Sequence, residues 1–197
     1  MFDEVLERNF NNINIDYGII NGNNNIVLIK TGREGNIYGY KNKYLELAKY
    51  INSKYGSTIF VSSNPNSSIN INQLDDAYML IEDYCSHYKY SEYQIYYIGI
   101  SNGGLVGAWY GYKYSRIKRM LLINSPLMIN YHNTKDGLKA FNNGKAILLY
   151  GSLDPSNKLV GLLDLINNDK IKYHIIDGGN HYLSNVDYKD LINYLYE

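Results

Sequence analysis

Short apolar segments alternate with longer amphipathic segments along most of the chain. The amphipathic segments Tyr44–Ile51 and Leu74–Cys85 place apolar residues three and four positions apart, close to the helical period of about 3.6 residues. The short segments are rich in β-branched and aromatic residues and are bounded by polar stretches, as strands are. They predict six strands, which are Ile26–Lys30, Thr58–Ser62, Gln94–Gly99, Met120–Ile123, Ala146–Tyr150 and Ile171–Ile176.

This alternation predicts an α/β fold, in which a mostly parallel sheet carries helices on both faces. Residues 12–21 predict one or two antiparallel strands at the edge of that sheet, and Asn21-Gly22 predicts a hairpin turn. Asn70-x-x-Gln73 has the spacing of a capping box ahead of the second helix. We expect the last helix to extend from about Val186 to Tyr196. Residues 1–197 contain no internal repeat or linker, so we expect a single domain.

Chemically reactive side chains follow three of the predicted strands. Ser101 lies in a Gly-x-Ser-x-Gly pattern after the third strand, Asp154 follows the fifth, and His181 follows the sixth. In an open parallel sheet, groups that follow the strands gather beyond their carboxyl ends. The pattern around Ser101 alone occurs about 0.1 times by chance in a chain of this composition, so the prediction rests on all three positions together. They form a candidate Ser-Asp-His set.

Other residues of the same types have plainer explanations. Asp177 is the alternative acid, but it lies very close in sequence to His181. His174 falls within a strand and His87 at a helix end, which favours structural roles, whereas His132 could line a pocket. Cys85 lies on the apolar side of a helix, where a core thiol is expected.

The order Ser, Asp, His and the bend after a central strand resemble the α/β-hydrolase family. The resemblance extends from about residue 13 to the end of the chain and includes the segments YGSLDP and GGNH. Thr31-Gly32-Arg33-Glu34-Gly35 lies where the family has an oxyanion loop with a His-Gly pair, and Thr31 stands in place of that histidine. The resemblance implies an α/β-hydrolase-like three-layer sandwich with little or no lid, and a nucleophile elbow at Ser101.

The same resemblance implies a role for each residue of the set. His181 would take the proton of the Ser101 hydroxyl, and Asp154 would orient the imidazole. The backbone N–H groups of Arg33 and Asn102 would bind the oxyanion. A positive φ is expected at Ser101, because the family presents its serine on a strained turn.

Composition indicates which partners, cellular location and cofactors to expect. Nineteen basic and nineteen acidic residues give a net charge of +0, which disfavours nucleic acid and anionic membranes as partners. The single cysteine and the absence of a signal-like or membrane-spanning apolar run favour a cytoplasmic protein. The 23 tyrosines could form a stacking surface, although ordinary packing explains them better. No spacing indicates a metal site, and we expect no cofactor.

The sequence therefore predicts a small serine hydrolase that acts on an ester, a thioester or a related acyl bond of a small-molecule or acyl-bearing substrate. The segment from Asn124 to Lys145 is too short for a large lid, and Pro126–Ile129 can form a pocket wall. Arg33 and Glu34 either select a charged group or are simply solvated. Acyl transfer and peptide cleavage use the same three groups, and a catalytically silent binding or assembly module is the alternative from another class. The oligomeric state stays open.

Overall fold

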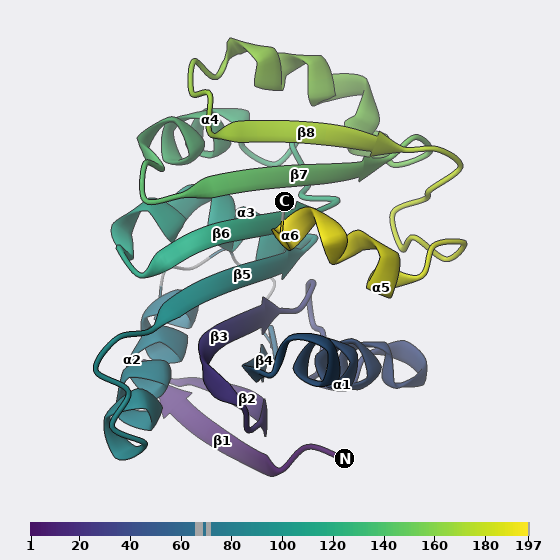
Figure 1. Ribbon diagram of the computed structural model, residues 1–197. Coiled ribbons are helices and arrows are strands. Elements are labelled where there is room, and N and C mark those ends of the chain that lie inside the picture. The colour runs from purple at the N-terminus through teal and green to yellow at the C-terminus, as the bar shows by residue number, and fades with distance from the viewer. Residues whose placement is uncertain (66–68, 70–71, 197) are drawn as a thin grey trace.

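The computed structural model describes residues 1–65, 69 and 72–196, except for the side chain of residue 72. Within these residues one sheet has eight strands in the order β1-β2-β4-β3-β5-β6-β7-β8 (Figure 1). Its strands are β1 Glu4–Phe10, β2 Ile13–Ile20, β3 Asn23–Lys30, β4 Ser57–Ser62, β5 Gln94–Ile100, β6 Ile117–Ile123, β7 Lys145–Gly151 and β8 Ile171–Ile176. Strands β3 to β8 are parallel, so all six predicted strands are confirmed.

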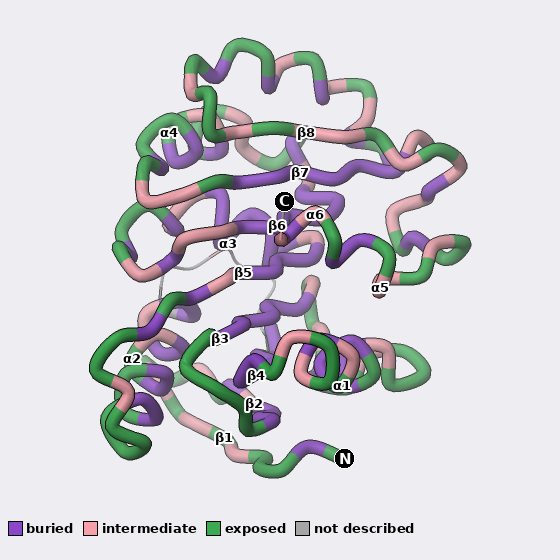
Figure 2. The backbone as a smooth tube through the Cα atoms, in the orientation of Figure 1, coloured by how far each residue is buried: buried purple, intermediate pink, exposed green. Residues whose placement is uncertain are grey.

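Helical segments cover both faces of the sheet, because alternate strand residues are apolar on each side. One face packs against α2 Asn72–His87, α3 Asn102–Tyr110, α4 Tyr131–Ala140 and the 3₁₀ segment η3 Pro155–Leu165. The other face packs against α1 Lys43–Tyr55, α5 Tyr188–Leu191 and α6 Asn193–Tyr196. Short 3₁₀ turns, η1 Tyr40–Asn42 and η2 Gly111–Lys113, precede α1 and follow α3. Figure 2 shows the buried residues concentrated in the central strands and on the inner sides of the helices.

The amino-terminal strands correct two predictions. The prediction of a hairpin turn at Asn21-Gly22 is wrong, since β2 pairs with β4 and not with β3. The hairpin lies one strand earlier, between β1 and β2, where Asn11 and Asn12 have φ values of 52° and 64°. Positive φ at both central residues is typical of a two-residue hairpin turn whose twist matches the strands. Strand β1 was not predicted.

The carboxyl-terminal helices correct a third prediction. The predicted helix from about Val186 to Tyr196 is two short helices, α5 and α6, which begin only after Asp187. The Asp187 side chain accepts a hydrogen bond from the amide of Lys189 and so fixes the first turn of α5. The predicted capping box involves Asn70, which lies outside the described residues. None of the helices described is long and apolar enough to cross a membrane.

The connection between β6 and β7 places no helix over the strand ends. It contains α4, which packs against α3 on one face of the sheet and not over the carboxyl ends of the strands (Figure 1). The Asn130 side chain caps α4 by accepting a hydrogen bond from the amide of Asn133. The expected absence of a large lid in this connection is therefore confirmed.

Candidate active site

Ser101 occupies a strained bend between β5 and α3. Its backbone has φ 52° and ψ −117°, which confirms the predicted positive φ and is costly for a residue with a Cβ atom. Neighbouring glycines permit the bend. A Cβ on Gly103 would lie 2.3 Å from the carbonyl oxygen of Lys30, and one on Gly99 would lie 2.6 Å from that of Gly103. The serine is thus held at the amino terminus of α3 by backbone packing that tolerates no side chain at these two positions.

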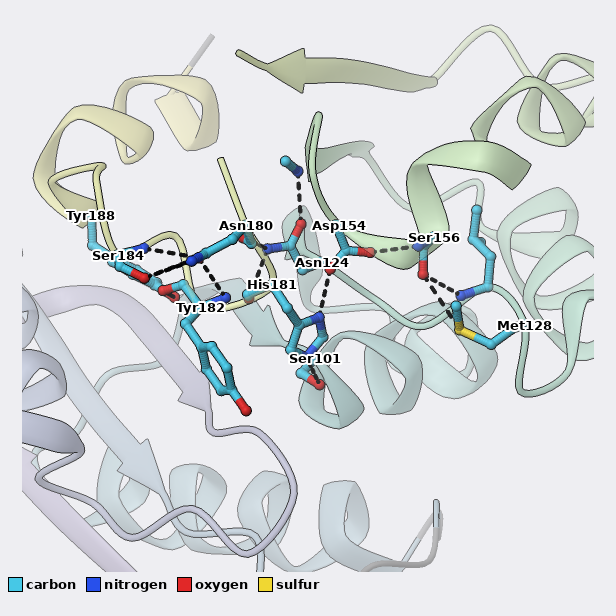
Figure 3. Close-up of polar contacts among 12 residues, drawn as sticks. Ser101, Asn124, Met128, Asp154, Ser156, Asn180, His181, Tyr182, Ser184 and Tyr188 are labelled. Carbon is cyan, nitrogen blue, oxygen red and sulfur yellow. Dashed lines mark hydrogen bonds and ion pairs between the residues drawn. The ribbon is translucent and has the colours of Figure 1, made fainter. Parts of the chain in front are cut away.

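The three predicted side chains lie in one hydrogen-bonded chain at the carboxyl ends of β5, β7 and β8 (Figure 3). The Oγ atom of Ser101 is 3.1 Å from Nε2 of His181. The Nδ1 atom of the same ring is 2.5 Å from Oδ2 of Asp154. Asp154 is buried, whereas 32% of the His181 side chain is exposed, so the histidine forms the border between the interior and solvent.

The partners of the imidazole determine its tautomer. An ionised carboxylate only accepts hydrogen bonds, so Nδ1 of His181 donates to Asp154. In the neutral ring Nε2 is then the acceptor and faces the hydroxyl of Ser101. Burial alone raises the pKa of Asp154, but the hydrogen bonds from His181 and from the amide of Ser156 outweigh it and hold that pKa below its ordinary value. The acid therefore stays ionised near neutral pH.

The loop after β3 lies against the serine. A Cβ on Gly32 would be 3.4 Å from the Cβ of Ser101, so the loop backbone reaches the nucleophile position. The loop is closed on itself, because Thr31 Oγ1 donates to the carbonyl of Gly35 at 3.0 Å and the amide of Gly35 donates to the carbonyl of Gly32 at 2.9 Å. Arg33 and Asn102, the two expected oxyanion donors, both line the cleft beside Ser101. Thr31 thus supplies a closing hydrogen bond at the position where the family's histidine was expected.

A buried polar cluster lies behind this loop. Lys30, the last residue of β3, is 1% exposed, and its Nζ donates to Ser62 Oγ at 3.0 Å and to the Ser63 carbonyl at 2.5 Å. Asn64, which follows Ser63, donates its backbone N–H to the Gly35 carbonyl at 2.8 Å. Burial lowers the pKa of Lys30 to about 7, while the nearby carboxylate of Asp76 opposes that shift. The end of β4 therefore connects the buried lysine to the loop at the active site.

Asn124 is an organising residue that the sequence reasoning missed. It follows β6 directly, is fully buried, and has a φ of 47°. Its Nδ2 donates to the carbonyls of Asn180 at 3.1 Å and His181 at 2.9 Å, and its Oδ1 accepts from the amide of Gly151 at 2.9 Å (Figure 3). One side chain thus connects the end of β7, just before the acid, to the loop that carries the histidine. The signal was present, since a polar residue directly after a buried strand falls at the same sheet edge as the other three groups.

The remaining candidates lie away from the serine. Asp177 is exposed and lies after β8, where no ion pair with a described residue is formed. His174 lies within β8 and His87 ends α2, as predicted, while His132 is exposed on α4 and does not line the cleft. Cys85 is buried in the core, as expected. Over the part of the chain that the structure describes, no group of three His, Cys, Asp or Glu side chains could hold a metal ion.

An open cleft of about 790 Å³ lies above Ser101 and His181. Pro126 and Ile129 form part of its wall, as predicted for the segment after β6. Its rim includes two strongly exposed tyrosines, Tyr40 at 78% and Tyr182 at 73%. Large exposed aromatic groups around a concave site are typical of ligand-binding surfaces.

Comparison with known proteins finds similarity at the level of structure. No family model matches the sequence, and no curated protein matches it. Among solved structures, Est1E from Butyrivibrio proteoclasticus is 12% identical, with a TM-score of 0.73 over 98% of this chain and 97% of its own. A putative alpha/beta hydrolase from Agrobacterium tumefaciens is 14% identical, with a TM-score of 0.74 over 98% and 94%. A cold-adapted esterase from an Arctic intertidal metagenomic library is 14% identical, with a TM-score of 0.75 over 97% and 91%.

Proposed function

The chain has an α/β-hydrolase fold, and from that premise we propose that it is a serine hydrolase cleaving an ester, a thioester or a related acyl bond. The observation that carries the proposal is the continuous contact from Ser101 through His181 to Asp154, on a serine whose backbone is strained. A serine that served only as a turn residue would not need that strain or the two further partners. The substrate is a small molecule or a group that protrudes into the open cleft.

The proposed reaction begins with the hydroxyl of Ser101. Its oxygen attacks the carbonyl carbon of the substrate while Nε2 of His181 takes the proton, and Asp154 stabilises the resulting imidazolium. The negative charge on the carbonyl oxygen is stabilised by the amides of Arg33 and Asn102, each worth about 3–4 kcal/mol where such donors have been removed. The imidazolium then protonates the leaving group, and an acyl-enzyme forms.

Deacylation repeats these steps with water. His181 removes a proton from a water molecule, the resulting hydroxide attacks the acyl carbon, and the carboxylic acid leaves as Ser101 recovers its proton. The imidazole edge that reaches solvent is consistent with this role, since 32% of the side chain is exposed. An acyltransferase or a peptidase would use the same first half of the reaction with another acceptor or bond.

A fluorophosphonate probe tests the proposal directly. Attack by the Ser101 oxygen forms a serine–phosphorus bond and releases fluoride, so the intact mass increases by one phosphonyl group. We expect labelling of the wild type and hydrolysis of p-nitrophenyl acetate, with both lost in Ser101→Ala, at least about a thousandfold for the hydrolysis. Ser115→Ala, which changes an exposed serine in the turn before β6 and outside the cleft, is the matched control. Absence of labelling in a folded wild type would instead favour a silent binding module, and labelling retained in Ser101→Ala would place the nucleophile elsewhere.

A further inference from the structure

A second cavity adjoins the candidate catalytic cleft. It has a volume of about 770 Å³ and lies between α1 and the segment that leads from the histidine to α5. The two cavities share four lining residues, which are Tyr40, Lys43, Tyr182 and Tyr188. A substrate held at Ser101 therefore has room to extend past these residues, and three of the four offer an aromatic ring.

Lys43 is the charged residue of this shared wall. It is the first residue of α1 and half-buried, with Nζ 5.0 Å from the ring centroid of Tyr44 and 5.1 Å from that of Tyr188. Burial lowers the pKa of Lys43. Among the residues that the structure describes, no carboxylate oxygen lies within 4.0 Å of its Nζ. Contact with two rings orients the ammonium group but leaves its charge without an anion.

The acidic residues of the two cavities are engaged elsewhere. These acidic lining residues are Glu34 in the cleft of Ser101 and Glu46 and Asp187 in the second cavity. Their contacts are Glu46 with Lys49 at 3.1 Å, Glu34 with Arg33 at 3.9 Å, and Asp187 with the amide of Lys189 at 2.9 Å. Two further lysines, Lys41 and Lys189, line the second cavity. The wall therefore offers an anion several ammonium groups, of which Lys43 alone also faces the cleft of Ser101.

We propose that the substrate carries an anionic group, a carboxylate or a phosphate, at a distance from the scissile acyl bond, and that Lys43 binds it. This inference rests on the proposed hydrolase function. The tyrosine rings would contact the part of the substrate between the two ends, and the half-buried ammonium would form a charge-assisted hydrogen bond with the anion, which is stronger than a neutral one. Lys43 is thus a specificity-determining residue, separate from the residues that act on the acyl bond.

Lys54 provides a matched control on the same helix. Its Nζ also lies over two tyrosine rings, at 5.3 Å from Tyr50 and 5.1 Å from Tyr55, but Lys54 lines neither cavity. It further donates to the hydroxyl of Tyr50 at 3.0 Å, so its ammonium group has a partner that Lys43 lacks. Replacement of either lysine removes one ammonium and one pair of ring contacts. Replacement of Lys54 also removes the hydrogen bonds to Tyr50 and to Asn193 Oδ1 at 3.3 Å, and only the change at Lys43 alters the shared wall.

The experiment compares esters that differ only in the anionic group. On the acyl side, p-nitrophenyl hydrogen glutarate is paired with its methyl ester. On the alcohol side, para-acetoxybenzoate is paired with its methyl ester and para-acetoxyphenyl phosphate with its dimethyl ester, both of which are neutral. We expect kcat/KM to favour the anionic member of at least one pair by about tenfold to a hundredfold, the value of one hydrogen bond to a charged group. Lys43→Met and Lys43→Gln should abolish that preference, measured as the ratio of kcat/KM within each pair, Lys43→Arg should retain part of it, and Lys54→Met should leave it unchanged.

Each other outcome overturns the inference. Equal kcat/KM within every pair, or a preference that survives both neutral replacements of Lys43, would mean that Lys43 does not bind the substrate. A preference for the anion that is lost equally in Lys54→Met would indicate a general effect of net charge. If none of the esters is turned over and the fluorophosphonate does not label the protein, the proposed function fails and this inference fails with it. Hydrolysis of the neutral esters distinguishes the two kinds of failure.

Discussion

Replacement of Lys30 by methionine tests whether the lysine behind the active-site loop is neutral in the folded protein. Lys30 is 1% exposed, and burial lowers its pKa to about 7, against an ordinary value of 10.5 in the unfolded chain. Between these two values the unfolded chain binds one more proton than the folded one, so the free energy of unfolding rises with pH. Below about pH 7 the lysine is charged in both states, and this contribution to the slope disappears.

The two pKa values give the size of the effect. A full shift from 10.5 to about 7 corresponds to about 5 kcal/mol across the whole window, since one pKa unit equals about 1.4 kcal/mol. Between about pH 7 and pH 9 the expected rise in the free energy of unfolding is about 2 kcal/mol. Lys30→Met should lack this rise, because methionine has a similar length and no titratable group.

Urea unfolding of both proteins at several pH values in that range measures the difference. All other titrating groups are common to the two proteins, so they cancel when the two slopes are subtracted. Staying below about pH 9 also avoids the tyrosines, which begin to lose protons from the unfolded chain above that range. The reasoning is refuted if the free energy of unfolding changes equally with pH in wild type and Lys30→Met. That result would mean that the carboxylate of Asp76 keeps the buried lysine charged throughout.

Four further changes test the site itself. Ser101→Gly should abolish ester hydrolysis yet leave the free energy of unfolding unchanged or up to about 1 kcal/mol higher, because glycine adopts positive φ without strain, and urea unfolding beside an activity assay measures both. Gly103→Val should destabilise the fold by several kcal/mol, since its Cβ would lie 2.3 Å from a backbone oxygen, and a wild-type melting temperature would contradict this. Asn124→Asp should lower kcat at least about tenfold, because a carboxylate would face the two carbonyls of the histidine loop, whereas normal kcat would remove its positioning role. Asp154→Asn should lower kcat about ten-thousandfold through the wrong histidine tautomer, with Asp177→Asn within twofold of wild type, and the reverse ranking would move the acid to Asp177.

The parallel strands and the three reactive side chains could be predicted because both depend on strong local signals. Segments such as Ile26–Lys30 and Ala146–Tyr150 are almost continuously apolar, which a strand buried on both faces requires. Once the strands are assigned, the parallel arrangement places whatever follows each strand at one edge. Ser101, Asp154 and His181 are brought together by that rule, and their contacts agree with it.

The features that were missed depend on partners far away in the sequence. Strand β1 lies at the sheet edge with no fully buried residue, so its apolar pattern is too weak to distinguish it from a loop. The dipeptide Asn21-Gly22 is typical of a hairpin turn, but β2 does not pair with β3. Both strands pair with β4, one on each of its edges. Likewise, the position of Asn124 directly after β6 places it at the edge of the sheet, but its bonding partners, at the end of β7 and in the loop after β8, lie far from it in the sequence.

The connection between β6 and α4 holds two tasks at separate residues. Asn124, the first residue after β6, binds the end of β7 and the histidine loop, and Pro126 and Ile129, which line the cleft, follow in the same connection. Ile129 is 51% exposed, so its side chain can be exchanged without opening a cavity in the core. Substitution at Ile129 therefore changes the wall of the cleft while Asn124 keeps its hydrogen bonds to the histidine loop.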